Sequence, residues 1–240
     1  MVGKDDIINM KTAKYTLKEI KPNIFHLQFQ DRYDLCMYFL RYQEFYESPS
    51  PKFRNKSFSI LSFMRWYSKK YGKGSFTYPN DWAGFNIPAN VIEKVHNLTI
   101  PDRNLYDYEM LNVYKHCKKS SKDFYLIGSI KKDEDVLNHE VAHGFFYTNK
   151  TYKSIMTKLT KSIPKDIRQS INSWLSLKGY TAKVFIDETQ AYLSTGMVFL
   201  DDILFKLSKS NKKKLQTISS AFIKVFKQYN NENLQRSLPV

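Results

Sequence analysis

The pattern of apolar and polar residues predicts two strands. Residues 23–30 (NIFHLQFQ) alternate between apolar and polar positions, as a half-buried strand does. Residues 122–130 (KDFYLIGSI) form one short apolar run rich in β-formers, which makes this the clearest strand of the chain. Residues 1–21 are polar, and their pattern is compatible with either a short strand or a short helix.

Helical spacing of apolar residues covers most of the remaining chain. Pro164 stands where a helix begins, and Gly179 and Gly196 stand where helices end. Residues 75–89 show no regular pattern. The predicted helices are 31–48, 57–74, 90–95, 104–117, the helix around 139–143, 151–162, 164–179, 181–196, 197–208 and 212–230.

These elements predict an α+β fold that is mostly helical, with a small sheet next to the helix around His139. No repeat and no Gly/Ser-rich or Pro-rich linker divides the chain, so we expect a single unit over 1–240. Within it we expect a mainly helical N-terminal portion (1–100), a portion carrying the candidate chemistry (101–228) and a polar tail (229–240).

Composition indicates a folded protein and limits its setting. Of the 240 residues 42% are hydrophobic, with 17 Tyr and 17 Phe, so we expect an aromatic core. Residues 1–21 contain no long apolar run and no window approaches about 20 apolar residues, so we expect neither a signal peptide nor a membrane anchor. Cys36 and Cys117 lie in unlike contexts, which favours two reduced thiols over a disulfide and hence a cytoplasmic protein.

The net charge of +15 raises the question of a nucleic-acid partner. Arginine, which recognises phosphate and guanine in a bidentate manner, accounts for only 7 of the 38 basic residues. A Lys-rich solvated surface explains the charge more simply. Specific nucleic-acid binding is therefore not the expected function.

The segment 133–149 (DEDVLNHEVAHGFFYTN) contains the pattern His-Glu-x-x-His at His139, Glu140 and His143. On a helix the two histidines lie on one face and can reach one metal ion, while Glu140 can act as the general base. Apolar residues on two sides of this helix indicate burial, which is costly for these polar groups without a partner. The alternative is a pair of hydrogen-bonded core histidines.

A third metal ligand can be sought downstream, because a catalytic zinc usually takes three protein ligands. No histidine follows His143, and only Glu188 and Glu232 follow as glutamates. Glu232 falls in the expected polar tail. Glu188 lies on the apolar face of the predicted helix 181–196, where a carboxylate needs a compensating charge. Glu188 is therefore the predicted third ligand.

The HEVAH motif followed by a helix that bears Glu188 resembles the zincin metallopeptidases of the gluzincin type. The resemblance covers roughly residues 122–196, and its second motif reads IDETQAY rather than the thermolysin-like pattern. It implies a zincin-like fold with one zinc ion per chain. It also implies that His139, His143 and Glu188 hold the metal and that Glu140 is the catalytic base.

Several neighbours are candidates for supporting roles. Asp187 adjoins the third ligand and can orient a histidine N–H. Tyr192 and Tyr147 each lie one helical turn beyond a predicted ligand and can donate to an oxyanion, although plain packing explains either equally well. The resemblance also implies that the strand 124–129 lies along the cleft, where its backbone could bind an extended peptide by strand addition. The aromatic stretch 77–88 is either a wall of the cleft or a loop packed on the core.

The predicted function is that of a zinc-dependent hydrolase, best described as a metallopeptidase acting on a peptide or protein substrate. Two other classes stay open. One is a protein with a zincin fold that binds partners without turnover, and the other is a Lys-rich nucleic-acid-binding protein.

Overall fold

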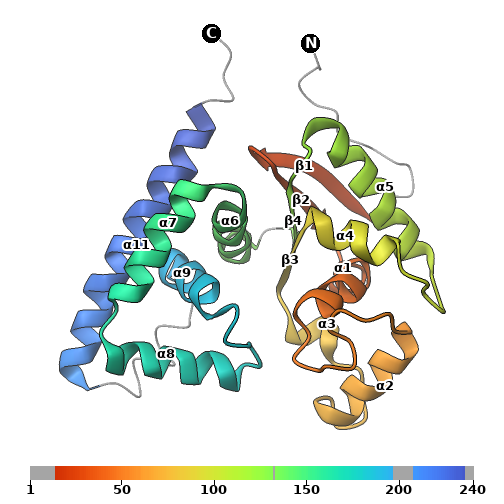
Figure 1. The fold of residues 1–240 in the computed structure, drawn as a ribbon, viewed down its shortest axis with the longest axis horizontal. Coiled ribbons are helices and arrows are strands. Elements are labelled where there is room, and N and C mark those ends of the chain that lie inside the picture. The colour runs from red at the N-terminus through yellow and green to blue at the C-terminus, as the bar shows by residue number, and fades with distance from the viewer. Residues whose placement is uncertain (1–13, 132, 197–207, 236–240) are drawn as a thin grey trace. The chain divides into compact units, whose positions relative to one another are not determined.

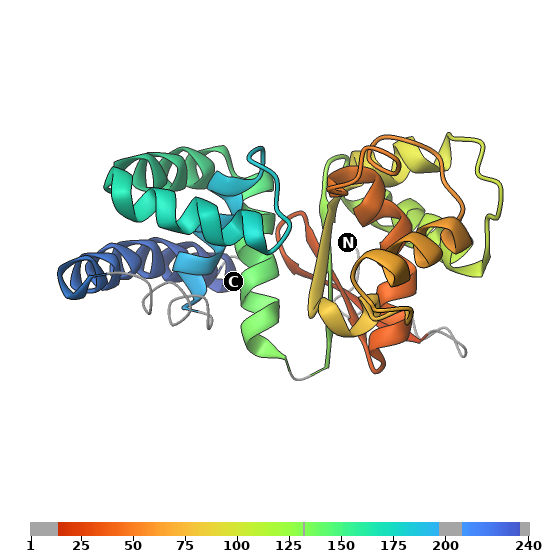
Figure 2. The same ribbon diagram turned by 90° about the horizontal axis from the view of Figure 1, so that it is seen from below.

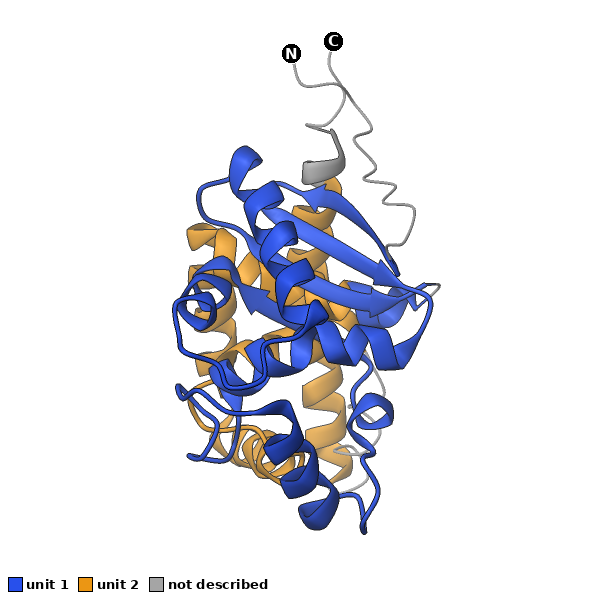
Figure 3. Ribbon diagram, turned by 90° about the vertical axis from the view of Figure 1, so that its right-hand side faces the viewer, with its two compact units in different colours: residues 1–137 blue, residues 138–240 orange. Residues whose placement is uncertain are grey.

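A computed structural model describes residues 14–131, 133–196 and 208–235. The chain divides into two compact units, residues 1–137 and residues 138–240 (Figure 3). The boundary falls inside helix α6 (Glu134–Thr148). It differs from the division expected near residue 100, because strand β4 (Tyr125–Ile130) pairs with strands of the N-terminal half.

The first unit is built on a four-stranded mixed sheet (Figure 1). β1 (Tyr15–Lys21) and β2 (Ile24–Phe29) form an antiparallel hairpin whose turn contains Asn23 in the left-handed conformation. β2 then pairs in parallel with β4, and β4 pairs antiparallel with β3 (Gly84–Pro88). The strand order is β1-β2-β4-β3, so the two strands expected from the sequence lie side by side at the centre.

The central position of β4 corrects one expectation. Its hydrogen-bonding edges face β2 on one side and β3 on the other, from Tyr125 onward. A peptide cannot add to a strand whose backbone groups are already paired on both sides. The expected role of residues 124–129 in strand addition is therefore wrong. The neighbouring stretch 77–88, expected to be a loop, in fact contains β3 and the short helix α3 (Tyr78–Asp81).

Helices pack against this sheet and enclose an aromatic core, as the composition predicted. Asp31 caps the first helix by accepting a hydrogen bond from the backbone N–H of Asp34. Cys36 and Cys117 are both buried and free, as expected. Besides α3, the helices described in this unit are α1 (Arg32–Glu47), α2 (Ile60–Lys70), α4 (Ala89–His96) and α5 (Leu105–Ser120).

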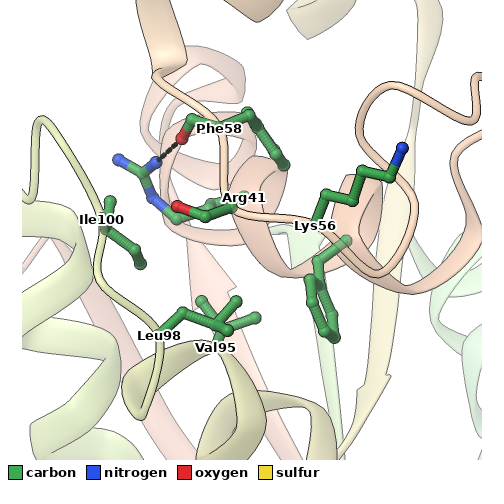
Figure 4. A pocket seen from close by; sticks show the side chains of 8 residues that line it. Arg41, Lys56, Phe58, Val95, Leu98 and Ile100 are labelled. Carbon is green, nitrogen blue, oxygen red and sulfur yellow. Dashed lines mark hydrogen bonds between the residues drawn. The ribbon is translucent and has the colours of Figure 1, made fainter.

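Arg41 is a buried cation of the first unit, and its partners show that its role is structural. Its guanidinium pairs with both carboxylate oxygens of Asp107, at 2.7 and 3.0 Å, and donates to the carbonyl of Phe58 at 2.6 Å. A third partner is Asp102 at 3.1 Å. The small pocket beside this side chain is lined mostly by apolar groups (Figure 4). Because these acceptors engage each guanidinium nitrogen, this pocket is no candidate anion site.

The second unit is helical. Its long helix α11 (Lys209–Gln235) packs along α9 (Phe185–Thr195) and α7 (Lys150–Ser162), and α8 (Lys165–Leu177) also contacts α9 (Figure 1). α9 therefore lies between the other helices.

The ends of these helices match the predicted ones only in part: α9 begins at Phe185 rather than at residue 181, and α11 begins at Lys209 rather than at residue 212. Gly179 and Gly196 adopt the left-handed conformation that ends a helix, as predicted. α11 continues to Gln235, so the first residues of the expected polar tail are helical. The helix expected over 197–208 falls almost wholly outside the described residues.

The fold class is α+β, mostly helical with one small sheet, as the sequence predicted. In the described part of the chain, no helix combines the length and the apolar character needed to cross a membrane.

Candidate metal centre

Helix α6 positions the His-Glu-x-x-His segment. Asp133 accepts a hydrogen bond from the backbone N–H of Val136 at the start of this helix. His139 and His143 are four residues apart and lie on one face, with their Nε2 atoms 3.2 Å from each other. Both histidines and Glu140 are buried. The segment therefore presents two imidazole nitrogens to one point inside the second unit.

Helix α9 brings Glu188 to the same point. Its Oε2 atom lies 3.7 Å from Nε2 of His143 and 3.9 Å from Nε2 of His139. The point equidistant from these three atoms lies about 2.1 Å from each, which matches the Zn–N and Zn–O distances of protein zinc sites. The three residues form a buried group that could hold a metal ion.

The electrostatics of the cluster also suit a cation. Burial lowers the pKa of His139 well below its ordinary value, and the neighbouring His143 lowers it further, so that His139 is neutral. Burial alone would lower the pKa of His143 too, but the carboxylates of Asp187 and Glu188 raise it to about 10. In the protein alone, the His143 proton balances this negative charge, and a bound divalent cation would balance it instead.

A chain of hydrogen bonds fixes the Nδ1 side of the His143 ring. Its Nδ1 atom donates to Oδ1 of Asp187 at 2.9 Å. The amide nitrogen of Gln190 donates to the same carboxylate oxygen at 3.0 Å and to the carbonyl of Ala142 at 3.3 Å. The hydroxyl of Tyr152 donates to the amide oxygen of Gln190 at 3.0 Å. Residues of α6, α7 and α9 thus fix the orientation of one imidazole.

Aromatic side chains form a wall beside His139. The ring centroid of Tyr192 lies 4.4 Å from that of His139, and Trp174 meets Tyr192 edge-on at 5.2 Å. The hydroxyl oxygens of Tyr180 and Tyr192 are 3.3 Å apart. The Nδ1 atom of His139 is buried without a hydrogen-bond partner among the described residues. Packing against Tyr192 therefore orients this second imidazole.

The motif that ends helix α8 positions Tyr180 at the site. The backbone N–H of Gly179 donates to the carbonyl of Ser176, and that of Tyr180 donates to the carbonyl of Leu175. This is the Schellman arrangement, which requires a left-handed residue after the helix, and Gly179 adopts a φ of 96° there. The glycine thus reverses the chain after α8, and Tyr180 returns toward Tyr192 instead of continuing along the helix.

Both tyrosine hydroxyls stay protonated in this setting. Burial raises the pKa of Tyr180 well above its ordinary value, and the Glu188 carboxylate raises it further. The same two causes raise the pKa of Tyr192. The charge of Glu140 also contributes to both shifts, which places its carboxylate within electrostatic range of the two phenols. The site therefore combines an ionisable carboxylate with two hydroxyl groups that remain hydrogen-bond donors.

Most of the predicted site residues come together. The structure clusters His139, His143 and Glu188 and places Asp187 against His143; the chemical roles assigned to these residues and to Glu140 stay predictions. Of the two proposed tyrosines, Tyr192 is in ring contact with His139. Tyr147 is half-buried, one turn after His143 on α6.

Four residues of the site were missed by sequence reasoning. A signal for Gln190 was available, because it lies three residues after Asp187 on a predicted helix and so shares its face. Nothing local marked the other three, which tertiary folding brings to the site. They are Tyr152, Trp174 and Tyr180.

Comparison with known proteins adds no further constraint. No family model, curated protein or solved structure matches this chain. The functional conclusion therefore depends on the geometry and chemistry of the site itself.

Proposed function

We propose that this protein is a metal-dependent hydrolase, and most simply a zinc metallopeptidase of the zincin type. One observation carries the proposal. Three ligand atoms from His139, His143 and Glu188 surround a single point about 2.1 Å away from each, inside a buried site. Two helices supply these atoms, so the arrangement depends on the fold and not only on the sequence motif.

The donor set favours zinc over other common ions. Two imidazole nitrogens and one carboxylate oxygen match the three-ligand sets of catalytic zinc, whereas calcium and magnesium prefer oxygen ligands alone. A metal held in this way would act as a Lewis acid that lowers the pKa of a water molecule and polarises a carbonyl group. The remaining chemistry falls to the side chains around it.

Glu140 is the proposed general base. It follows His139 directly on α6 and is buried, and its charge raises the pKa of His143, Tyr180 and Tyr192. A carboxylate so placed takes a proton from the attacking water and passes it to the leaving amine. The low exposure of Glu140 keeps bulk water away from this proton transfer.

Tyr192 and Tyr180 are the proposed donors to the oxyanion that forms when the carbonyl is attacked. Both phenols are protonated, since burial and the nearby carboxylates raise their pKa values. Their oxygens are 3.3 Å apart, so the two hydroxyl groups can share one acceptor. Tyr192 also packs on His139, which supports a role for its hydroxyl group beside the proposed metal.

The first test is metal content. Purified protein exposed to zinc and then desalted is expected to hold one equivalent per chain by elemental analysis. Changing Glu188 to Gln removes the charged ligand and is expected to weaken zinc binding at least tenfold. A matched change outside the site, Asp166→Asn, replaces an exposed carboxylate of the same unit by its amide and should leave zinc binding unaltered. Protein that retains no zinc at neutral pH would contradict the proposal.

The second test separates binding from turnover. Glu140→Gln is expected to keep one zinc per chain and to lose at least a hundredfold in the rate of peptide hydrolysis, because only the base is removed. Hydrolysis is measured on a broad peptide library by mass spectrometry. Cleavage that survives in Glu140→Gln rules out Glu140 as the base. Zinc binding without any cleavage by the unaltered protein would favour a partner-binding role.

A further inference from the structure

A dense group of basic side chains lies at one corner of the second unit. The end of α7, the start of α8 and the start of α11 meet there, as Figures 1 and 2 show. The amide of Asn211 on α11 donates to Asp166 on α8 at 2.7 Å, and Arg168 donates to the carbonyl of Lys161 at 3.0 Å. We call this group the lysine corner. It consists of Lys158, Lys161, Lys165, Arg168, Lys209, Lys212, Lys213 and Lys214.

The charge of the lysine corner is largely uncompensated. Residues 158–168 and 209–214 contain eight cations and one acid, Asp166. Across the described residues, no ion pair within 4.0 Å involves any of the eight. Six of them are exposed, and Arg168 and Lys212 are half-buried. Like charges on these adjoining segments repel each other, and an anionic partner would relieve that repulsion.

The composition of the corner restricts the class of partner. Neither segment contains a Phe, Tyr or Trp on which a nucleic-acid base could stack. The one arginine already donates to a backbone carbonyl, and lysines do not give the bidentate recognition that suits phosphates. Ile163 and Ile167 are buried and Leu159 is half-buried, so the two segments expose no large apolar side chain that could insert into a lipid surface. Flexible carboxylate side chains fit this array of separate point charges.

Helix α8 connects the lysine corner to the candidate metal centre. Asp166 lies in its first turn, and Trp174, whose ring contacts Tyr192, lies eight residues later. Eight residues of α-helix span about 12 Å. Two ring contacts, from Trp174 to Tyr192 at 5.2 Å and from Tyr192 to His139 at 4.4 Å, extend this path to the metal centre to roughly 20 Å, which an extended polypeptide covers with about six residues. A chain held at the metal centre could therefore reach the corner with a neighbouring segment.

We propose that the lysine corner binds an acidic segment of the polypeptide substrate, about six residues from the bond that is cut. This inference rests on the proposed peptidase function for its choice of a polypeptide over other polyanions. It goes further by naming the substrate class: proteins with a run of Asp or Glu beside the cleavage site. The corner raises the local concentration of such substrates and fixes their register at the metal centre.

The test measures binding separately from cleavage. A fluorescent peptide with six consecutive Glu residues, and a matched peptide with Gln in their place, are titrated against full-length Glu140→Gln protein by anisotropy at 0.15 M salt. The corner variant changes Lys212, Lys213 and Lys214 to Gln. The control variant changes Lys150, Lys224 and Lys227 to Gln, which removes the same charge from α7 and α11 outside the corner.

The acidic peptide is expected to bind, and the Gln peptide is not. Each exposed ion pair is worth roughly a factor of two to three in affinity, so the corner variant should bind the acidic peptide about tenfold more weakly. The control variant should bind as the parent does. Equal weakening in both variants means a general effect of charge and overturns the proposal. So does a corner-dependent preference for a 20-base-pair DNA duplex or for phosphatidylserine vesicles over the peptide.

Cleavage assays then distinguish the two proposals. For these assays the three corner changes are made in protein that retains Glu140. They should raise KM about tenfold for peptides with an acidic run and leave kcat unchanged. If the peptide binds through the lysine corner but the protein cleaves nothing, the hydrolase proposal fails and the lysine-corner proposal stands. If peptides with and without the acidic run are cleaved with the same KM, the lysine-corner proposal fails and the hydrolase proposal stands.

Discussion

Gln190 offers a sharp test of how the fold orients the residues of the proposed metal centre. The side chain is fully buried and links Tyr152 to Asp187, which in turn holds His143. Replacing Gln190 with Leu keeps the apolar bulk near that of the amide but removes every hydrogen bond that the amide makes. The change does not touch any predicted ligand. Its effect on metal binding therefore reports the orientation of His143 alone.

The expected magnitudes follow from the lost hydrogen bonds. A bond to a carboxylate contributes about 1.5–3 kcal/mol, and the buried hydroxyl of Tyr152 left without an acceptor costs about 1–3 kcal/mol. After allowance for the added apolar contact, Gln190→Leu should lower the free energy of unfolding of the metal-free protein by about 3 kcal/mol. Loss of support for a ligating histidine typically costs 10–100-fold in metal affinity. That range corresponds to about 1.4–2.7 kcal/mol.

Two assays separate the effects. Urea denaturation of the metal-free protein gives the change in stability, and competition with a chromophoric chelator gives the zinc affinity. Ser219→Ala is the matched control, because it also removes a buried hydrogen bond of the second unit, from Ser219 Oγ to the carbonyl of Leu193 at 3.0 Å. The control should lose about 1 kcal/mol and keep its zinc affinity. If Gln190→Leu loses stability yet binds zinc as tightly as the parent, the hydrogen-bonded chain does not position His143.

Three further predictions concern the first unit. Burial lowers the pKa of His26 to about 4, so between pH 4 and 6.5 the unfolded chain binds more protons than the folded one. Acidification from pH 6.5 to pH 4 should therefore lower the free energy of unfolding by up to about 3 kcal/mol. The His26→Gln protein should not show this loss. Burial raises the pKa of Glu44, which favours its neutral form, so Glu44→Gln should raise the urea midpoint at pH 8 and not at pH 4. A Cβ on Gly128 would lie 2.7 Å from Cζ of Phe39, so Gly128→Ala should lower the free energy of unfolding by about 1–3 kcal/mol and lower the Tm. An unchanged Tm would show that Phe39 can move aside.

The helices were predictable because their signals are local. The spacing of apolar residues and the caps at Asp31, Gly179 and Gly196 lie within each segment, and the structure agrees with them. Strand β3 was missed for the opposite reason. Its sequence, GFNIP, contains Gly84 and Pro88 and shows little β-propensity, and it is a strand because it pairs with β4.

The site shows the same division between local and tertiary signals. The spacing of His139 and His143 is a property of one helix, and Glu188 stood out because few acids follow the motif. Tyr152 and Tyr180 could not be found in this way. Each is one of 17 tyrosines, and each reaches the site through the packing of α7 or through the left-handed turn after α8.

The parallel pairing of β2 with β4 affects how the protein folds while it is being synthesised. Ile24 pairs with Tyr125, 101 residues later, so the sheet cannot close until most of the first unit has left the ribosome. At 5–20 residues per second that delay lasts about 5 to 20 seconds. During it, the β1–β2 hairpin can form, but the other edge of β2 has no partner. β2 is almost wholly buried in the folded protein, but during this delay its open edge can pair with neighbouring nascent chains. We therefore expect the risk of aggregation to be greater during synthesis than in the folded state.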